Sequence, residues 1–258
     1  MMTIAIFDSG AGGLTVLNTF LKLNYQATFI YFADTDQVPY GEKAPNLVAS
    51  YVVDSVNFLA QKKIDALVIA CNTATSLAIN ELRDQSKFNF PIFGMEPAVK
   101  LAVDLLKDKI SAKILITASA ITANSQQLDQ LKRRFAKQAI FETQVLGELV
   151  RFAENNQFNE EKIYNYLEEK FGQKRSCDAV VLGCTHFSFF KKTFEKFFGP
   201  KTLIVDGNLG TAQHVIKKLK LKKIVKEQKN KNKIKFYFSK KSDPQLEKKY
   251  QDLLKKLD

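Results

Sequence analysis

The chain has 258 residues, 45% of them hydrophobic, which excludes an intrinsically disordered protein and is enough for two modest domains. The formal net charge is +12, but 16 lysines and only five acidic residues follow position 216, so the positive excess belongs to the C-terminal segment. There is no basic leader with a cleavage site, and no apolar run near the roughly 20 residues that span a bilayer, so neither a signal peptide nor a membrane helix is expected.

Apolar runs typical of buried strands alternate with helical patterns along the chain. In the first part, strands are predicted at residues 4–7, 28–33, 66–70 and 92–94, and helices at 14–23, 46–62 and 75–85. In the second part, strands are predicted at 113–117 and 179–182, and helices at 125–136 and 163–171. This alternation is typical of the α/β class, in which parallel sheets are covered by helices on both faces.

Two segments of the chain resemble each other, and each ends in a cysteine. Residues 65–71 (DALVIAC) match residues 178–184 (DAVVLGC) by identity or conservative replacement at every position. The spacing also repeats: Cys71 lies 63 residues after Asp8, and Cys184 lies 65 residues after Ser119, each counted from the end of the first strand of its half. We therefore predict two α/β domains related by pseudo-symmetry, each with a cysteine at the carboxyl end of a buried strand.

Polar residues follow the predicted strands at the edge where open parallel sheets bind ligands. They are Asp8, Ser9, Asp34, Cys71, Asn72, Thr73, Ser119, Cys184, Thr185 and His186. If the two halves face each other, these side chains converge on a single cleft between them.

Two opposed thiols suit the racemisation of an amino acid. One group must remove the α-proton from one face of the carbon, and a second group must return a proton to the other face. Cys71 and Cys184 each precede a predicted helix or turn whose N–H groups would stabilise a thiolate. His186 lies two residues from Cys184 and is predicted to support it as an acid or base. Hydroxyls, amides and helix N-termini would stabilise the charge that develops on the α-carboxylate.

Other interpretations of these residues stay open at this point. A cysteine after a buried strand is often only a small apolar residue, and Cys177, which has no symmetric mate, is predicted to be structural. The turn at residues 10–13 is not a dinucleotide motif, because Thr15 stands where the third glycine belongs; its glycines are expected to let a small anion approach backbone N–H groups. A metal site would lack the usual ligand spacing, and a Cys–His hydrolase would leave the second thiol unexplained.

Four blocks resemble, in order and spacing, the signature blocks of the glutamate racemases of the aspartate/glutamate racemase family. They are residues 8–17 (DSGAGGLTVL), 38–43 (VPYGEK), 70–74 (ACNTA) and 182–186 (LGCTH). The resemblance extends over residues 4–210. It implies two flavodoxin-like domains with the active site between them, one formed by residues 1–97 and 207–258 and the other by residues 98–206.

The resemblance implies a cofactor-independent enzyme that interconverts L-glutamate and D-glutamate by two-base proton transfer at the α-carbon. It implies no metal, a cytoplasmic homodimer without a membrane partner, and a supply of D-glutamate for peptidoglycan. Aspartate racemases are the nearest alternative, and the complete Val-Pro-Tyr-Gly block favours glutamate.

Individual roles follow from the matching positions. Cys71 would serve the D-enantiomer with help from Asp8, and Cys184 the L-enantiomer with help from His186. The acidic partner of the histidine falls on Glu154, with Glu148 as the alternative. Substrate binding is implied for Asp8, Ser9, Pro39, Tyr40, Gly41, Asn72, Thr73, Ser119, Thr122, Thr185 and His186. The chain departs from the family pattern at Ala118, where a glycine is usual, and at Phe187 and Ser188, where the pair Tyr-Pro is usual.

The basic C-terminal segment has two interpretations. Its lysines can form the solvated faces of terminal helices, or they can attract a polyanion. The segment carries no recognised nucleic-acid motif, so a nucleic-acid partner is not expected. The competing hypothesis for the whole chain is a non-catalytic protein that uses this segment to bind an acidic partner.

Overall fold

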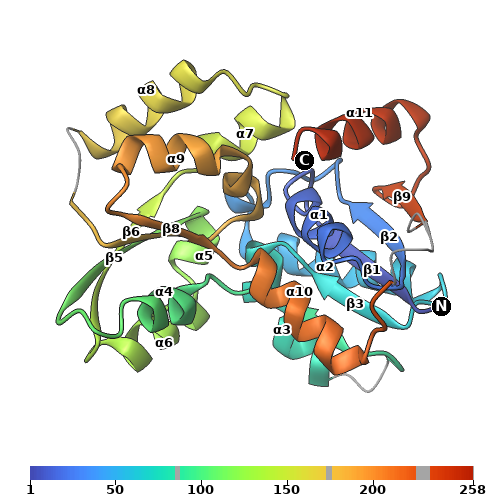
Figure 1. Ribbon diagram of the computed structural model, residues 1–258. Helices are drawn as coiled ribbons and strands as arrows, with labels where there is room; N and C mark the ends of the chain where they lie inside the picture. The colour runs from blue at the N-terminus through green and yellow to red at the C-terminus, as the bar shows by residue number, and fades with distance from the viewer. Residues whose placement is uncertain (85–87, 173–175, 225–232, 258) are drawn as a thin grey trace.

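The computed structural model describes residues 1–84, 88–172, 176–224 and 233–257 and contains two parallel sheets (Figure 1). The five-stranded sheet has the order β4-β3-β1-β2-β9, with strands at Thr3–Asp8 (β1), Thr28–Ala33 (β2), Ala66–Ile69 (β3), Ile92–Gly94 (β4) and Ile234–Phe238 (β9). The four-stranded sheet has the order β6-β5-β7-β8, with strands at Ala112–Ala118 (β5), Ala139–Val145 (β6), Ala179–Leu182 (β7) and Leu203–Asp206 (β8). Every pairing within the two sheets is parallel, which confirms the predicted fold class.

Helices cover both faces of the first sheet because successive strand residues point to opposite sides. In β1, Ile4 and Ile6 pack with α1, α10 and α11, whereas Ala5 and Phe7 pack with α2 and α3. The helices are α1 (Leu14–Leu23), α2 (Pro45–Ala60), α3 (Asn72–Asp84), α10 (Asn208–Leu219) and α11 (Pro244–Lys255), with a short 3-10 helix η1 at Tyr40–Glu42. Burial on both faces is why these strands are continuous apolar runs in the sequence.

The second sheet is built in the same way. In β5, Leu115 faces one core, and Ile114 and Ile116 face the other. The covering elements are α4 (Val99–Leu105), α5 (Ala120–Ala123), α6 (Gln126–Phe135), α7 (Glu148–Glu154), α8 (Glu160–Phe171), the 3-10 helix η2 (Thr185–Phe190) and α9 (Lys191–Phe198). None of the helices in the described residues is long and apolar enough to cross a membrane.

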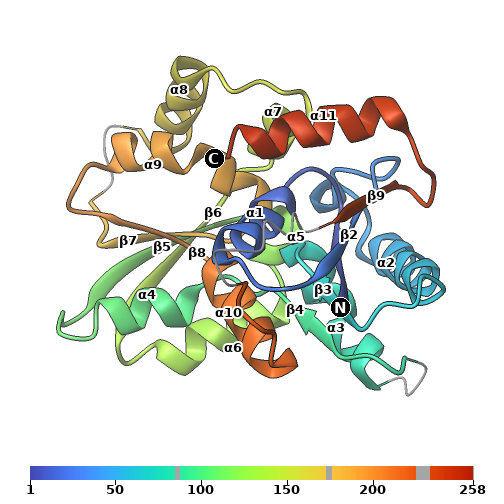
Figure 2. The ribbon, with the colours of Figure 1, turned by 45° about the vertical axis from the view of Figure 1, so that its right-hand side comes forward.

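The end of the chain returns to the first sheet. Strand β9 pairs in parallel with β2, and the following helix α11 buries Tyr250 and Leu253 in the core beside α1. From there α11 extends towards α7 of the second half (Figure 2). The division into domains at residues 97 and 206 stays a prediction, although the strands of each sheet come from the expected segments.

The predicted elements lie where the patterns placed them, with shifted ends. Helix α3 starts at Asn72, before the predicted residue 75, because the carbonyl of Cys71 already accepts the N–H of Thr75. Residue 85, the predicted end of this helix, lies outside the described residues. Helix α8 starts at Glu160 instead of 163, since the Asn159 side chain accepts the N–H of Lys162 and caps the first turn. The patterns did not predict the edge strands β6 and β8 or the helices α4, α7, α9 and α10.

Candidate active site

A cavity of about 100 Å³ lies between the two halves, at the carboxyl ends of strands from both sheets. Since one water needs roughly 10–15 Å³, this space admits a small molecule. Its lining residues are Ser9, Pro39, Tyr40, Gly41, Glu42, Cys71, Thr73, Ser119, Ala120, Val145, Gly147, Val150, Cys184 and His186. Nine of the residues predicted from the sequence therefore share one cavity wall.

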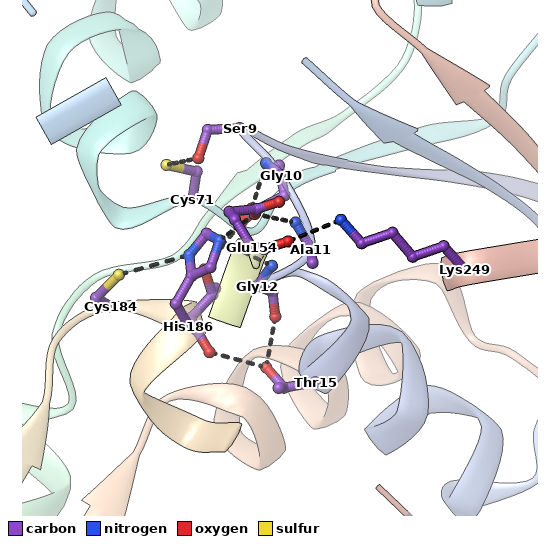
Figure 3. Close-up of polar contacts among 12 residues, drawn as sticks. Ser9, Gly10, Ala11, Gly12, Thr15, Cys71, Glu154, Cys184, His186 and Lys249 are labelled. Carbon is purple, nitrogen blue, oxygen red and sulfur yellow. Dashed lines mark hydrogen bonds and ion pairs between the residues drawn. The ribbon is translucent and has the colours of Figure 1, made fainter. Parts of the chain in front are cut away.

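The two cysteines occupy equivalent places in the two sheets. Cys71 stands between β3 and α3, and Cys184 stands between β7 and η2. The thiol of Cys71 donates to Ser9 Oγ at 3.7 Å, whereas Cys184 Sγ lies 3.8 Å from Nδ1 of His186 (Figure 3). The repeat in the sequence thus corresponds to one thiol from each half on a common cavity.

The surroundings of Cys71 favour its neutral form. Burial, together with the negative charge of nearby Asp8, raises the pKa of Cys71 to about 12. Burial also raises the pKa of Asp8, although its carboxylate accepts the Gly10 N–H and the Thr185 hydroxyl, each at 3.0 Å. Asp8 lies behind the cavity wall, so it acts on Cys71 through charge.

Cys184 has the opposite surroundings, because His186 and Glu154 form a buried pair beside it. Nε2 of His186 lies 2.6 Å from Oε1 of Glu154. Burial alone disfavours the imidazolium, but hydrogen bonds with Cys184 and Glu154 and their negative charges raise the pKa of His186 well above its ordinary value. Burial likewise raises the pKa of Glu154, but the hydrogen bond and charge of His186 outweigh burial and leave that pKa below the usual range. His186 is therefore protonated, with Nε2–H donating to Glu154 and Nδ1–H directed at Cys184.

The glycine-rich turn before α1 brings the first half into contact with this pair. The N–H of Ala11 donates to Oε1 of Glu154 at 2.7 Å. A Cβ on Gly10 would overlap the Glu154 carboxylate, and a Cβ on Gly12 would lie 2.5 Å from Nδ1 of His186. The N–H of Gly12 lies 3.2 Å from Nε2 of His186 and can donate to it only when that nitrogen carries no proton. The turn was expected to receive a small anion; in the structure it receives the chain's own Glu154 carboxylate.

Hydroxyl groups from both halves meet at another wall of the cavity. Thr73 Oγ1 lies 2.8 Å from Ser119 Oγ, which also contacts Thr122 Oγ1 at 3.1 Å. Ser119 caps the first turn of α5 by accepting the N–H of Thr122. Gly41 packs against Ser119, where a Cβ would come within 2.8 Å of the serine Cβ. These hydroxyls supply neutral donors and acceptors to the cavity.

Tyr40 and Pro39 form the side of the cavity near β2. The Tyr40 hydroxyl donates to Asp34 Oδ2 at 2.7 Å, and Ser239 from the C-terminal part donates to the other carboxylate oxygen of Asp34 at 2.9 Å. Burial and the Asp34 charge raise the pKa of Tyr40, so the phenol stays neutral. Asp34 does not line the cavity, so it anchors Tyr40 from behind. The Val38–Pro39 peptide bond is cis.

Some predicted residues stand behind the wall instead of in it. They are Asp8, Asn72, Thr122, Glu154 and Thr185. The Asn72 amide donates to the carbonyl of Met95 at 3.1 Å, and its Oδ1 is buried without a partner among the described residues. Of the two candidate acids, only Glu154 contacts His186.

The alternative acid, Glu148, lies on the surface and is 3.8 Å from Arg151. Arg151 in turn forms an ion pair with Glu42, which joins the two halves at the mouth of the cavity. Glu42 belongs to the recognised block at 38–43 and could have been found from the sequence. Val145 and Gly147 could not, because the patterns did not reveal the strand that carries them there.

Comparisons with known proteins agree with this site. Residues 24–215 match the family model described as Asp/Glu/Hydantoin racemase. The chain is 42% identical to a glutamate racemase of Halothermothrix orenii, over 99% of this chain and 100% of the relative. It is also 42% identical to glutamate racemase 2 of Bacillus subtilis, over 84% and 82% of the two chains.

Solved structures give the same result. The crystal structure of glutamate racemase from Campylobacter jejuni has a TM-score of 0.84 at 28% identity and covers 98% of both chains. That of Escherichia coli glutamate racemase in complex with L-glutamate and the activator UDP-MurNAc-Ala has a TM-score of 0.79 at 27% identity, over 99% of this chain and 95% of the other. The chain thus belongs to the Asp/Glu/Hydantoin racemase family, as the four sequence blocks predicted.

Proposed function

We propose that the chain interconverts L-glutamate and D-glutamate without a cofactor, by proton transfer between the α-carbon and two cysteines. The observation that carries the proposal is that Cys71 and Cys184, from equivalent strand ends of two sheets, line the same small cavity. The proposal is further supported by relatives named glutamate racemase over the full chain, and by the Escherichia coli relative crystallised with L-glutamate.

In the L-to-D direction, the Cys184 thiolate takes the α-proton and becomes a thiol. The electron pair left on the α-carbon is delocalised into the α-carboxylate, and the Cys71 thiol then donates its proton to the opposite face and becomes a thiolate. The resting state suits this direction, since the His186 imidazolium favours a negative charge on Cys184 while burial keeps Cys71 protonated. The reverse reaction exchanges the roles of the two thiols.

The D-to-L direction needs Cys71 as the thiolate. Because Asp8 raises the pKa of Cys71 by its charge, a protonated Asp8 makes that thiolate less costly. Burial raises the pKa of Asp8 itself, which favours the protonated form when negative charge collects nearby. Asp8 is thus proposed to assist Cys71, and His186 with Glu154 to assist Cys184.

The substrate carboxylates meet neutral groups in this proposal. The described lining residues include neither lysine nor arginine, and they offer the hydroxyls of Ser9, Thr73 and Ser119. Such preorganised donors stabilise charge that develops on the α-carboxylate in the transition state. Asn72 Oδ1, an acceptor without a partner among the described residues, is proposed to receive the substrate ammonium. Pro39, Tyr40, Gly41, Thr122 and Thr185 complete the proposed binding site.

The test is racemisation in heavy water, with a chelator present and no added cofactor. We expect L-glutamate and D-glutamate each to give the other enantiomer, seen by circular dichroism, with deuterium at the α-carbon of the product. Cys71→Ser and Cys184→Ser should each abolish inversion, whereas the matched change Cys177→Ser should not, because that residue is remote from the cavity. Full activity in Cys71→Ser would contradict the two-base proposal, and inversion of aspartate alone would move the substrate to the related racemases.

The cellular part of the proposal is a cytoplasmic homodimer that supplies D-glutamate for peptidoglycan. It is tested by rescue of a bacterium that requires D-glutamate and by sedimentation of the purified chain. Failure to rescue by a chain that is active in solution would separate this role from the catalytic one.

A further inference from the structure

The C-terminal helix places a lysine against the acid/base pair of the second half. Helix α11 belongs to the first half, since its Tyr250 and Leu253 are buried in the core of the five-stranded sheet. Yet Lys249 on this helix reaches across to Glu154, the last residue of α7 (Figures 2 and 3). A residue 95 positions away in the sequence thus touches the partner of His186.

The contact is made with the backbone and leaves the carboxylate to other donors. Lys249 Nζ donates to the carbonyl oxygen of Glu154 at 2.7 Å. The last four carbonyls of a helix have no partner within the helix, and a lysine ammonium there satisfies one of them and opposes the negative end of the helix dipole. Lys249 therefore fixes the main chain of Glu154, while Ala11 and His186 hold Oε1 of its carboxylate.

The end of the chain is itself fastened on both sides of Lys249. Lys256 Nζ donates to Asn156 Oδ1 at 2.8 Å, just after α7, and lies 5.1 Å from the ring centre of Phe158. On the other side, the carbonyl of Leu257 accepts hydrogen bonds from Lys22 and Asn18 of α1 at 2.7 and 3.1 Å. With the helix tied to α1 and to the segment after α7, Lys249 has a defined position relative to Glu154.

The ammonium also acts on the pair by its charge. Among the influences on Glu154, Lys249 contributes to the lowering of its pKa, after the hydrogen bond and charge of His186 and the N–H of Ala11. An ionised Glu154 stabilises the His186 imidazolium, which in turn favours the Cys184 thiolate. Loss of Lys249 would release the Glu154 main chain and weaken this series of charges together.

We propose that Lys249 is a positioning residue of the active site, which holds Glu154 towards His186 and so keeps the Cys184 side ready for proton transfer. This inference rests on the proposed function for its kinetic consequence, but its structural content concerns His186 alone. The C-terminal helix thereby becomes part of the catalytic architecture, although none of its residues lines the cavity.

The test compares Lys249→Met with Lys248→Met. The two variants make the same change on adjacent residues, and Lys248 is exposed. Lys249→Met should lower kcat/KM about 10-fold in both directions, mainly through kcat, since misplacing a catalytic group by about 1 Å can cost up to about 100-fold. It should also move the alkaline limb of the pH profile to lower pH, because His186 loses its proton more easily. Lys249→Arg, which can still donate to the carbonyl, should restore most of the activity, and Lys248→Met should match the wild type.

A second readout does not depend on activity. The chain has only two histidines, so nitrogen-15 NMR of the imidazoles follows His186 with His214 as an internal reference. In Lys249→Met, the pKa of His186 should fall relative to the wild type, while the signals of His214 stay unchanged and thermal unfolding remains cooperative. An unchanged His186 titration would overturn the proposal, whatever the kinetics. If the wild type does not racemise glutamate but the His186 shift is seen, the proposed function fails while the positioning of Glu154 by Lys249 stands.

Discussion

Gly10 allows the sharpest test of how the two halves assemble the active site. A Cβ at this position would overlap Oε1 of Glu154 and lie 2.8 Å from its Cδ, whereas ordinary contact needs 3.4–4 Å. In Gly10→Ala the Glu154 carboxyl carbon must therefore retreat by the difference, about 0.6 to 1.2 Å. Gly10 is not among the glycines with positive φ, so alanine adds no backbone strain and the damage is confined to this contact.

A displacement of that size predicts a loss in rate and little loss of fold. Misplacement of a catalytic group by about 1 Å can cost on the order of 100-fold in rate, so kcat/KM of Gly10→Ala should fall about 100-fold in both directions. The assay is racemisation followed by circular dichroism, together with thermal unfolding. The matched control is Gly210→Ala in α10, where an added Cβ meets nothing within 4 Å, and its kcat/KM should equal that of the wild type.

A double-mutant cycle identifies Glu154 as the cause. Glu154→Asp shortens the side chain by one methylene and makes room for the alanine Cβ, so Gly10→Ala should cost much less in that background than in the wild type. Equal costs in the two backgrounds, or a Gly10→Ala variant within twofold of wild-type activity, would refute the reasoning.

Three further predictions follow from the electrostatics of the described residues. Glu154→Gln should lose stability relative to the wild type mainly at intermediate pH: the contribution of Glu154 fades as pH falls below 4.5 through its lowered pKa, and that of His186 fades as pH rises above 6.5 through its raised pKa, measured by urea unfolding across pH. A stability difference that does not vary with pH would contradict the pair. Alkylation of Cys71 by iodoacetamide in the absence of substrate, followed by mass spectrometry, should be slow at neutral pH and rise about 10-fold per pH unit towards its pKa of about 12, beyond the point where a model thiol levels off. Reversing the charge of Lys217 and Lys218 in α10 should leave racemisation unchanged; salt-dependent DNA binding by the wild type that this change removes would favour the competing binding function.

The sequence by itself determined the strands of the two halves and the residues at their carboxyl ends. Strands buried on both faces are continuous apolar runs, which is why β1, β3 and β7 could be located to within a residue or two. The repeat that ends in Cys71 and Cys184 needed only local comparison. The edge strand β6 escaped because one side of it is open to solvent and Glu142 interrupts its apolar pattern.

The tertiary structure decided which groups support the two thiols. From the sequence, Glu154 and Glu148 were both candidates for the partner of His186, since both lie in the same short segment before any fold is known. Packing of α7 against the turn at Gly10 selects Glu154, through contacts between residues more than 140 positions apart. Lys249 could not have been found at all, because its contact with Glu154 exists only once the end of the chain has returned to the first sheet and α11 has reached the second half. Local patterns report which face of a strand or helix is buried, and only the packed chain determines what lies against it.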